Sequence, residues 1–313
     1  MDKTSKIYIA GHRGLVGSAI WRSLQNKGYT NLIGKSHAEL DLLNSNAVKD
    51  FFEKEKPEFV VLAAAKVGGI IANNTYRADF IYENLQIQQN VIGESFRHNV
   101  KKLLFLGSTC IYPKNAPQPM PENALLTGEL EQTNEPYAIA KIAGLKMCDS
   151  FNLQYGTNYI AVMPTNLYGP NDNFHPENSH VLPAMIYKIH KAKCEGADVL
   201  ELWGTGEPLR EFLWSEDMAD ACVYCLENIN YADVKSHINI GTGKEISIAN
   251  LAALVAKTIG YNGKIIFDSS KPNGTMRKLC DVSKIQSMGW RHKIEIEEGV
   301  EKLYKWYLKN ERR

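Results

Sequence analysis

Short apolar runs alternate with longer amphipathic stretches through the first half of the chain. The runs at 6–10, 31–34, 59–65, 103–107 and 159–163 have the length and composition of buried strands. Apolar residues three and four apart predict helices between them, most clearly at 15–27 and 79–99. Strands that alternate with helices favour a parallel sheet with helices on both faces. We therefore expect an α/β fold with a Rossmann-like, doubly wound parallel sheet.

The pattern changes after about Pro164. A polar, loop-like stretch is followed by a helix at 181–194, a strand at 199–205, a helix at 215–228 and a strand at 237–241. The tail mixes helices with a short strand near Ile265. We expect one domain over 1–170 with a returning segment at about 211–241, and a smaller C-terminal α/β domain made of 171–210 and 242–313.

Composition excludes several classes of protein. The 313 residues are 44% hydrophobic and 23% charged, with a formal net charge of +1, which predicts a folded chain without a nucleic-acid or membrane partner. Apolar runs fall short of the roughly 18 residues of a membrane span, and the polar start does not resemble a signal peptide. Six scattered cysteines favour a reducing, cytoplasmic setting. Cys222 and Cys225 lie on an expected helix without metal-site spacing, so we interpret them as buried thiols and expect no metal.

A glycine motif follows the first expected strand. Gly11, Gly14 and Gly17 form a G-x-x-G-x-x-G pattern between a strand and a helix. Glycines at these places permit a tight turn, and they let a pyrophosphate approach the backbone N–H groups at the helix N-terminus. A dinucleotide site is predicted here. The later Gly241-Thr242-Gly243 lacks the third glycine, and Ser247 is expected to cap the next helix.

The residues after the second expected strand indicate which dinucleotide would bind. An NAD site places an acid there for the ribose hydroxyls, whereas this strand is followed by Lys35, Ser36 and His37. Arg13 of the glycine turn would project to the same place, and a guanidinium suits a phosphate. We therefore expect NADP(H).

A second constellation indicates carbonyl chemistry. Ser108 follows the fourth expected strand, and Tyr137 and Lys141 lie four apart at the start of a helix, so both face the same way. An ammonium beside a phenol would lower the phenol's pKa, so that it could exchange protons near neutrality. Together with the glycine turn, these residues resemble the short-chain dehydrogenase/reductase family.

Longer segments narrow the resemblance. Residues 63–70, 72–75, 134–141, 163–170 and 173–176 closely resemble the GDP-L-fucose synthases, which are 3,5-epimerases and 4-reductases of GDP-4-keto-6-deoxy-D-mannose within the extended branch of that family. The resemblance covers about 6–310 and implies a homodimer through the helices near 79–99 and 137–155. It implies that Ser108, Tyr137 and Lys141 serve the ketone at C4, and that Cys110 and His180 are the base and acid of epimerisation.

The same resemblance implies the binding residues. GDP would be held by Trp203 and Arg210, with Lys188 and Asn273 at positions where the family has Arg and Asp. His37 stands where an Arg is expected near the 2′-phosphate. The implied cofactor contacts are Gly11, His12, Arg13, Gly14, Leu15, Val16, Gly17, Lys35, Ser36, His37, Asp41, Leu42, Ala64, Leu106, Lys141, Pro164, Asn166, Leu167 and His180.

Physical chemistry is compatible with the epimerase pair. A hydrogen next to a ketone is acidic only if the enolate oxygen is stabilised, as Ser108 could do, and inversion needs a base on one face and an acid on the other. A thiol becomes a competent base once its pKa falls, and an imidazole suits proton transfer near neutral pH. His175 competes with His180 for the acid, although Pro176 beside it suggests a position that shapes a loop.

Other functions stay open from the residues. A nucleotide-sugar 4,6-dehydratase would carry an acidic pair after the serine, where this chain has Thr109 and Cys110. A 4-epimerase would want NAD, whose expected acid is absent. A non-catalytic protein that senses NADP or a nucleotide sugar would be expected to lack the tyrosine or the lysine, and both are present.

Overall fold

Six parallel strands form the main sheet of the part of the chain that the structure describes. The structure is a computed structural model and describes residues 1–175, 179–271 and 273–310. The strands are β1 (Ile7–Ala10), β2 (Leu32–Ile33), β3 (Phe59–Leu62), β4 (Lys102–Leu106), β5 (Tyr159–Pro164) and β10 (His237–Ile240). They lie in the order β10-β5-β4-β3-β1-β2, with neighbours paired in parallel. The order reverses between β1 and β3, which is where open α/β sheets bind ligands.

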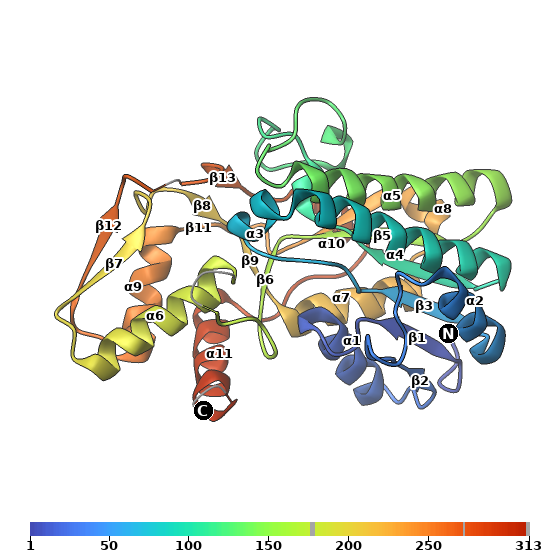
Figure 1. Ribbon diagram of the computed structural model, residues 1–313, viewed down its shortest axis with the longest axis horizontal. Coiled ribbons are helices and arrows are strands. Elements are labelled where there is room, and N and C mark those ends of the chain that lie inside the picture. The colour runs from blue at the N-terminus through green and yellow to red at the C-terminus, as the bar shows by residue number, and fades with distance from the viewer. Residues whose placement is uncertain (176–178, 272, 311–313) are drawn as a thin grey trace.

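Helices cover both faces of this sheet (Figure 1). On one face α4 (Arg77–Arg97) packs along α5 (Glu135–Tyr155), and on the other α1 (Leu15–Asn26) packs along α7 (Ser215–Asn228). The helix α2 (Ser45–Glu55) packs against α4. The strands β1, β3, β4 and β5 are buried along their whole length, as a doubly covered parallel sheet requires.

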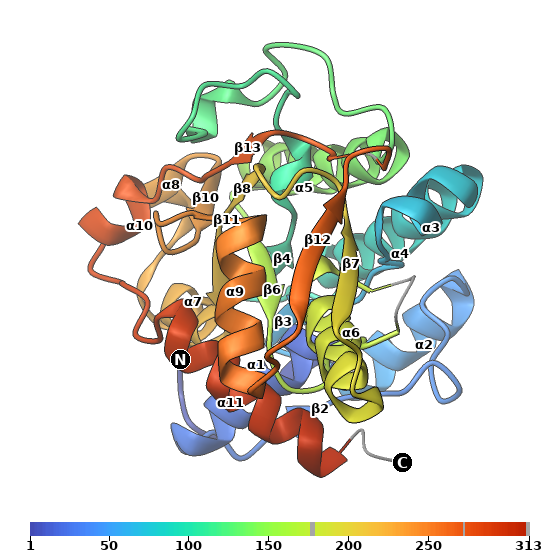
Figure 2. The same ribbon diagram turned by 90° about the vertical axis from the view of Figure 1, so that its left-hand side faces the viewer.

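A second set of elements surrounds a separate hydrophobic cluster. Small sheets pair β7 (Val199–Trp203) with β12 (Lys264–Asp268), β8 (Leu209–Arg210) with β11 (Ile246–Ser247) and β13 (Arg277–Lys278), and β6 (Asn166–Tyr168) with β9 (Phe212–Trp214). The helices α6 (Val181–Glu195), α9 (Ile248–Ile259) and α11 (Ile296–Asn310) pack nearby. Figures 1 and 2 show β7, β12, α6 and α9 together at one end of the molecule.

Short elements complete the described chain. They are α3 (Ile70–Thr75), η1 (Thr109–Ile111), η2 (Glu122–Ala124), α8 (Tyr231–Val234) and α10 (Ser283–Ser287).

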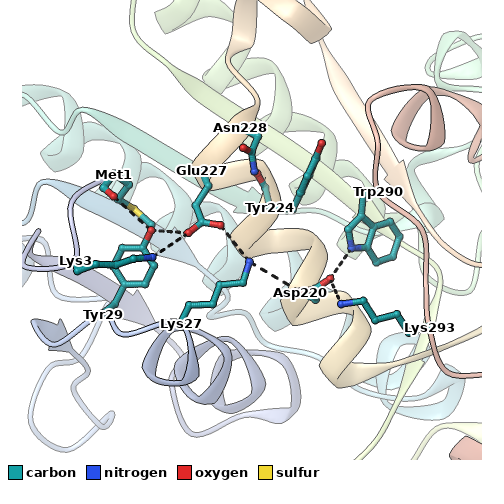
Figure 3. Close-up of polar contacts among 10 residues, drawn as sticks. All are labelled: Met1, Lys3, Lys27, Tyr29, Asp220, Tyr224, Glu227, Asn228, Trp290 and Lys293. Atoms are coloured by element: carbon teal, nitrogen blue, oxygen red, sulfur yellow. Dashed lines mark hydrogen bonds and ion pairs between the residues drawn. The ribbon is translucent and has the colours of Figure 1, made fainter.

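A polar network fastens α7 to the N-terminal part of the chain (Figure 3). Lys27, directly after α1, lies 3.1 Å from Glu227 and 4.0 Å from Asp220, both on α7. The hydroxyl of Tyr29 donates to Glu227 at 2.6 Å. Asp220 also accepts a hydrogen bond from the indole of Trp290 at 3.0 Å. The segment that leads to α11 is therefore tied to the same helix as the first α/β unit.

The predicted strands and helices are confirmed, with ends that differ by a few residues. The largest difference is at β3, which ends at Leu62 rather than at 65, because the chain then leaves the sheet to line a cavity. Cys222 and Cys225 are buried thiols, as expected, and Ser247 caps α9 by accepting from the backbone N–H of Asn250. Among the described residues, every helix is too short or too polar to cross a bilayer.

Candidate active site

A cavity of about 930 Å³ lies at the carboxyl ends of the central strands. Gly11 after β1, Ala64 after β3, Ser108 after β4 and Pro164 at the end of β5 all line it. The cavity continues to β8, β13 and α6, so it reaches both hydrophobic clusters. This is the place that the strand order predicts for a ligand.

The glycine turn shapes one end of the cavity. Gly11 has a φ of +83°, a conformation that favours glycine. A Cβ on Gly17 would lie 2.1 Å from the carbonyl oxygen of Gly11, so a side chain there would push the turn off the helix. Gly14 is the N-cap of α1 and Leu15 its first residue, and both line the cavity. Backbone N–H groups at a helix N-terminus favour an anion such as a pyrophosphate.

The residues after β2 are arranged less simply than predicted. Lys35 and His37 line the cavity, but both donors of Ser36, its N–H and its hydroxyl, bind the carboxylate of Glu39 at 2.8 Å and 2.6 Å. These hydrogen bonds lower the pKa of Glu39, and the charges of Lys35 and Arg13 lower it further. Arg13 and Lys35 therefore share one neighbourhood, as expected, but it also holds an acid.

Glu39 was missed by the sequence analysis. The Ser-x-x-Glu spacing of a capping box was the available signal, because such a glutamate folds back onto the serine backbone. The predicted cofactor residues line the cavity except His12, Arg13 and Ser36. The ring of His12 packs 5.6 Å from that of Trp21 instead.

The predicted tyrosine and lysine share one side of α5. Lys141 is 2% exposed, and its ammonium donates to the carbonyl of Leu106 at 2.8 Å. That ammonium lies 5.7 Å from the centre of the Tyr137 ring, whose other neighbours include Phe80 in an edge-on contact at 6.2 Å. Burial lowers the pKa of Lys141 to about 8, against a raising effect of the nearby thiol of Cys110. The lysine is thus poised to change its charge just above neutral pH.

The predicted lowering of the tyrosine pKa is wrong. Burial raises the pKa of Tyr137 above its usual value, and the adjacent Cys110 raises it further. The physical reason is that a buried phenolate loses its hydration. The ammonium of Lys141, which is hydrogen-bonded to the carbonyl of Leu106, does not stabilise the phenolate enough to compensate for this loss. Tyr137 is therefore a neutral phenol at physiological pH, which suits a proton donor.

Cys110 lies in the short helix η1, which follows the carboxyl end of β4. The hydroxyl of Ser108 caps η1 and accepts from the backbone N–H of Cys110 at 3.3 Å. The thiol is 6% exposed and lines the cavity. Burial raises the pKa of Cys110, while the charge of Lys278, the hydroxyl of Ser108 and the charge of Lys141 act in the opposite direction.

His180 directly precedes α6 and lines the same cavity as Cys110. It occupies the N-cap position of α6 without a capping hydrogen bond from its side chain, and it lines the cavity. His180 is exposed to the open cavity, but desolvation by the protein atoms around it lowers its pKa, and Lys278 lowers it further. His175 is not among the described residues that line the cavity, and Pro176 lies outside the described residues. The geometry favours His180 over its competitor.

The four predicted GDP residues line the far end of the cavity. The ammonium of Lys188 lies 5.3 Å from the centre of the Trp203 ring. Arg210 donates to the backbone carbonyl of Asn273 at 3.4 Å. The amide oxygen of Asn273 accepts from the backbone N–H of Thr205 at 2.8 Å, so it holds the turn after β7. An aromatic face beside cations can receive a base and a diphosphate.

Two further residues were not found from the sequence. Glu211 is 0% exposed and binds three backbone N–H groups, those of Thr242, Gly243 and Cys280, at 2.6 Å, 2.7 Å and 2.8 Å. Lys278 lines the cavity beside Cys110. The sequence shows an acid next to Arg210, but not its burial, because the backbone N–H groups that it binds belong to distant segments.

The chain is similar to known proteins over nearly its whole length. Residues 7–241 match the NAD dependent epimerase/dehydratase family. The chain is 60% identical over 309 residues to GDP-L-fucose synthase 1 of Arabidopsis thaliana, covering 99% of this chain and 95% of the relative. It is 54% identical over 314 residues to GDP-L-fucose synthase of Escherichia coli, covering 98% of each.

Solved structures of related enzymes have a similar fold over nearly the whole chain. A GDP-6-OMe-4-keto-L-xylo-heptose reductase from C. jejuni matches with a TM-score of 0.95 at 44% identity, over 99% of each chain. MlghC, a GDP-mannoheptose C4 reductase from Campylobacter jejuni with NADP bound, matches with a TM-score of 0.92 at 46% identity, over 98% of this chain and 99% of that one.

Proposed function

Because the chain belongs to the NAD-dependent epimerase/dehydratase family, in the branch of the GDP-L-fucose synthases, we propose that it converts GDP-4-keto-6-deoxy-D-mannose into GDP-L-fucose. One observation carries the proposal. The trio Ser108, Tyr137 and Lys141 and the pair Cys110 and His180 line one cavity. Carbonyl reduction and inversion of the neighbouring carbons can therefore use the same C4 oxygen.

The cofactor of this reaction is NADP(H), which supplies a hydride when bound. The residues fit it, because the cradle at Gly11 and Gly17 has no room for a Cβ and opens onto the N-terminus of α1. Lys35 and Arg13 would hold the 2′-phosphate. A phosphate there competes with Glu39 for the donors of Ser36.

Epimerisation uses the pair on either side of the sugar. The thiolate of Cys110 removes a proton from the carbon next to the ketone, and the electron pair moves onto the C4 oxygen. Ser108 and Tyr137 hydrogen-bond this oxyanion. His180 then gives a proton to the opposite face, which inverts the carbon. The lowered pKa of His180 makes its protonated form a stronger acid for this step.

Reduction completes the reaction at C4. Tyr137, a neutral phenol in this setting, gives its proton to the C4 oxygen as the ketone becomes an alcohol. Lys141, held by the carbonyl of Leu106, keeps a positive charge on the same side of α5. Trp203 and Arg210 hold the GDP moiety, with Lys188 and Asn273 beside them.

A second candidate function is reduction of a GDP-linked 4-keto heptose. Its support is the similarity to the two Campylobacter reductases, at 44% and 46% identity over nearly whole chains. The two substrates share a GDP-linked 4-keto sugar and differ in the length of the sugar chain. Turnover of the heptose, with little turnover of the 6-deoxy hexose, would favour this second function.

The wider organisation is also a proposal. The proposed domains are an NADP-binding domain (1–170 with about 211–241) and a substrate-binding domain (171–210 and 242–313). In support, most residues of the first hydrophobic cluster lie in the former and most of the second in the latter, although Cys280, Val282, Ile285 and Trp290 pack in the first cluster and Tyr168, Phe212 and Trp214 in the second. The enzyme is a cytoplasmic homodimer that uses α4 and α5. These helices expose Tyr82, Ile139 and Leu153, whose apolar surface would be covered by a second copy.

Deuterium exchange tests the assignment of the base. In heavy water, with the ketone substrate and no reduced cofactor, the wild-type enzyme should introduce deuterium at C3 and C5. Cys110→Ser should not, because an alcohol is far less acidic than a thiol, and His180→Asn should slow or misdirect reprotonation. With NADPH, both variants should still reduce the ketone slowly. NMR of the recovered sugar is the measurement, and wild-type exchange in Cys110→Ser would show that another residue is the base.

A further inference from the structure

The backbone around Lys278 is held from three sides. Lys278 pairs in parallel register with Arg210, through β13 and β8 (Figure 2). Just beyond it, the carbonyl of Leu279 accepts from the N–H of Met120 at 2.7 Å. Glu211 binds the N–H of Cys280 at 2.8 Å. The lysine side chain therefore starts from a fixed point at the wall of the cavity.

Lys278 and Cys110 line the same two cavities. Both residues line the large cavity, and both also line a recess of about 20 Å³ next to it. The neighbouring Arg277 also lines this recess, but its guanidinium is paired with Glu245 at 2.7 Å. The titratable groups that face Lys278 or Cys110 are Tyr137 and Lys141 from α5, His180 from α6, Arg210 from β8, Glu131 from the segment before α5, and Cys280.

We propose that Lys278, which shares the cavity and the recess with Cys110, is a positioning residue that stabilises the thiolate of Cys110 for proton abstraction, an inference that rests on the proposed epimerase function. Lys278 then sets the pH at which epimerisation begins, while the reduction at C4 depends on Tyr137 and Lys141.

The environment of the thiol explains why such a cation is needed. Burial raises the pKa of Cys110, the wrong direction for a base, and it outweighs the opposing influences of the neighbouring groups. Lys278 is the strongest of the influences that oppose burial, ahead of Ser108 and Lys141. Lys141 is engaged with the carbonyl of Leu106. The interaction is mutual, because the charge on Cys110 raises the pKa of Lys278 against the lowering effect of burial.

Thiol alkylation in the full-length enzyme tests the proposal without any sugar substrate. Iodoacetamide reacts with thiolates, and peptide mass spectrometry reports Cys110 separately from the exposed Cys194, which is the internal reference. Lys278→Met should slow alkylation of Cys110 at neutral pH by about tenfold, the effect of losing one nearby opposite charge. It should also move the pH profile of alkylation upward, whereas Lys278→Arg should restore it. Arg277→Met, next in the chain, should match the wild type.

A second measurement separates this role from binding of the diphosphate. In Lys278→Met, deuterium exchange at C3 and C5 should fall with the alkylation rate, while KM for the sugar and NADPH oxidation with an already epimerised ketone change little. An alkylation profile that superimposes on the wild type, or a raised KM with unchanged exchange, would overturn the proposal. If the wild-type enzyme exchanges no deuterium, the proposed function fails instead, and the alkylation comparison still decides whether Lys278 acts on Cys110.

Discussion

Glu211→Gln should destabilise the protein strongly although it changes few atoms. One carboxylate oxygen accepts from Thr242 and Gly243, and the other from Cys280. Glutamine can keep the first two bonds, but its NH₂ group then faces the N–H of Cys280. A buried donor without a partner costs about 1–3 kcal/mol of folding free energy. The other two hydrogen bonds would have a neutral acceptor in place of a charged one, which weakens each by roughly 1 kcal/mol. The expected loss in the free energy of unfolding is about 3–5 kcal/mol.

Urea unfolding followed by tryptophan fluorescence measures this loss. Glu207→Gln is the matched control, because Glu207 is exposed and close in the chain, and it should shift the free energy of unfolding by less than about 0.5 kcal/mol. Equal midpoints and slopes for the two variants would show that the three hydrogen bonds contribute little, and the reasoning from buried donors would be refuted.

Three further predictions concern catalysis. Tyr137→Phe keeps the ring beside Phe80 but removes the proton donor, so NADPH oxidation should fall at least ~100-fold with cofactor binding intact; a near-normal rate would identify another acid. Arg13→Ala should remove most of the preference for NADPH over NADH, about tenfold in kcat/KM from a charge-assisted contact of roughly 1.5–3 kcal/mol; equal kcat/KM values in the wild type would contradict the assignment. Lys141 loses its charge as the pH rises through its pKa of about 8, so kcat/KM for reduction should decline above that pH, and a flat profile would show that the charge is not needed.

The parts of the site that depend on local pattern were predictable. The glycine turn joins a strand directly to a helix, so its three glycines could be located from their spacing alone. Tyr137 and Lys141 are one helical turn apart, and that separation places them on the same side of α5. In both cases the residues that act together are neighbours in the chain.

The parts that depend on distant pairing were not predictable. Lys278 lies on a two-residue strand, which is too short to have a period, and it reaches Cys110 only because β13 pairs with β8. The partners of Glu211 come from segments about thirty and seventy residues further along, a spacing without a sequence signature. The wrong prediction for the pKa of Tyr137 has another origin, since the spacing to Lys141 can be read from the sequence, whereas burial of the phenol cannot.

The place of β10 at the edge of the main sheet has a consequence for how the protein is made. β10 covers β5 with His237–Ile240, and the chain builds much of its second hydrophobic cluster before it reaches those residues. During synthesis, β5 therefore remains an unpaired edge strand until most of the 313 residues have left the ribosome. All of its residues are buried in the folded protein. Exposed apolar edges of this kind invite aggregation. A nascent chain that is released before residue 240 has been made should depend on chaperones. A chain that extends past residue 240 contains β10, which can pair with β5 and complete the sheet.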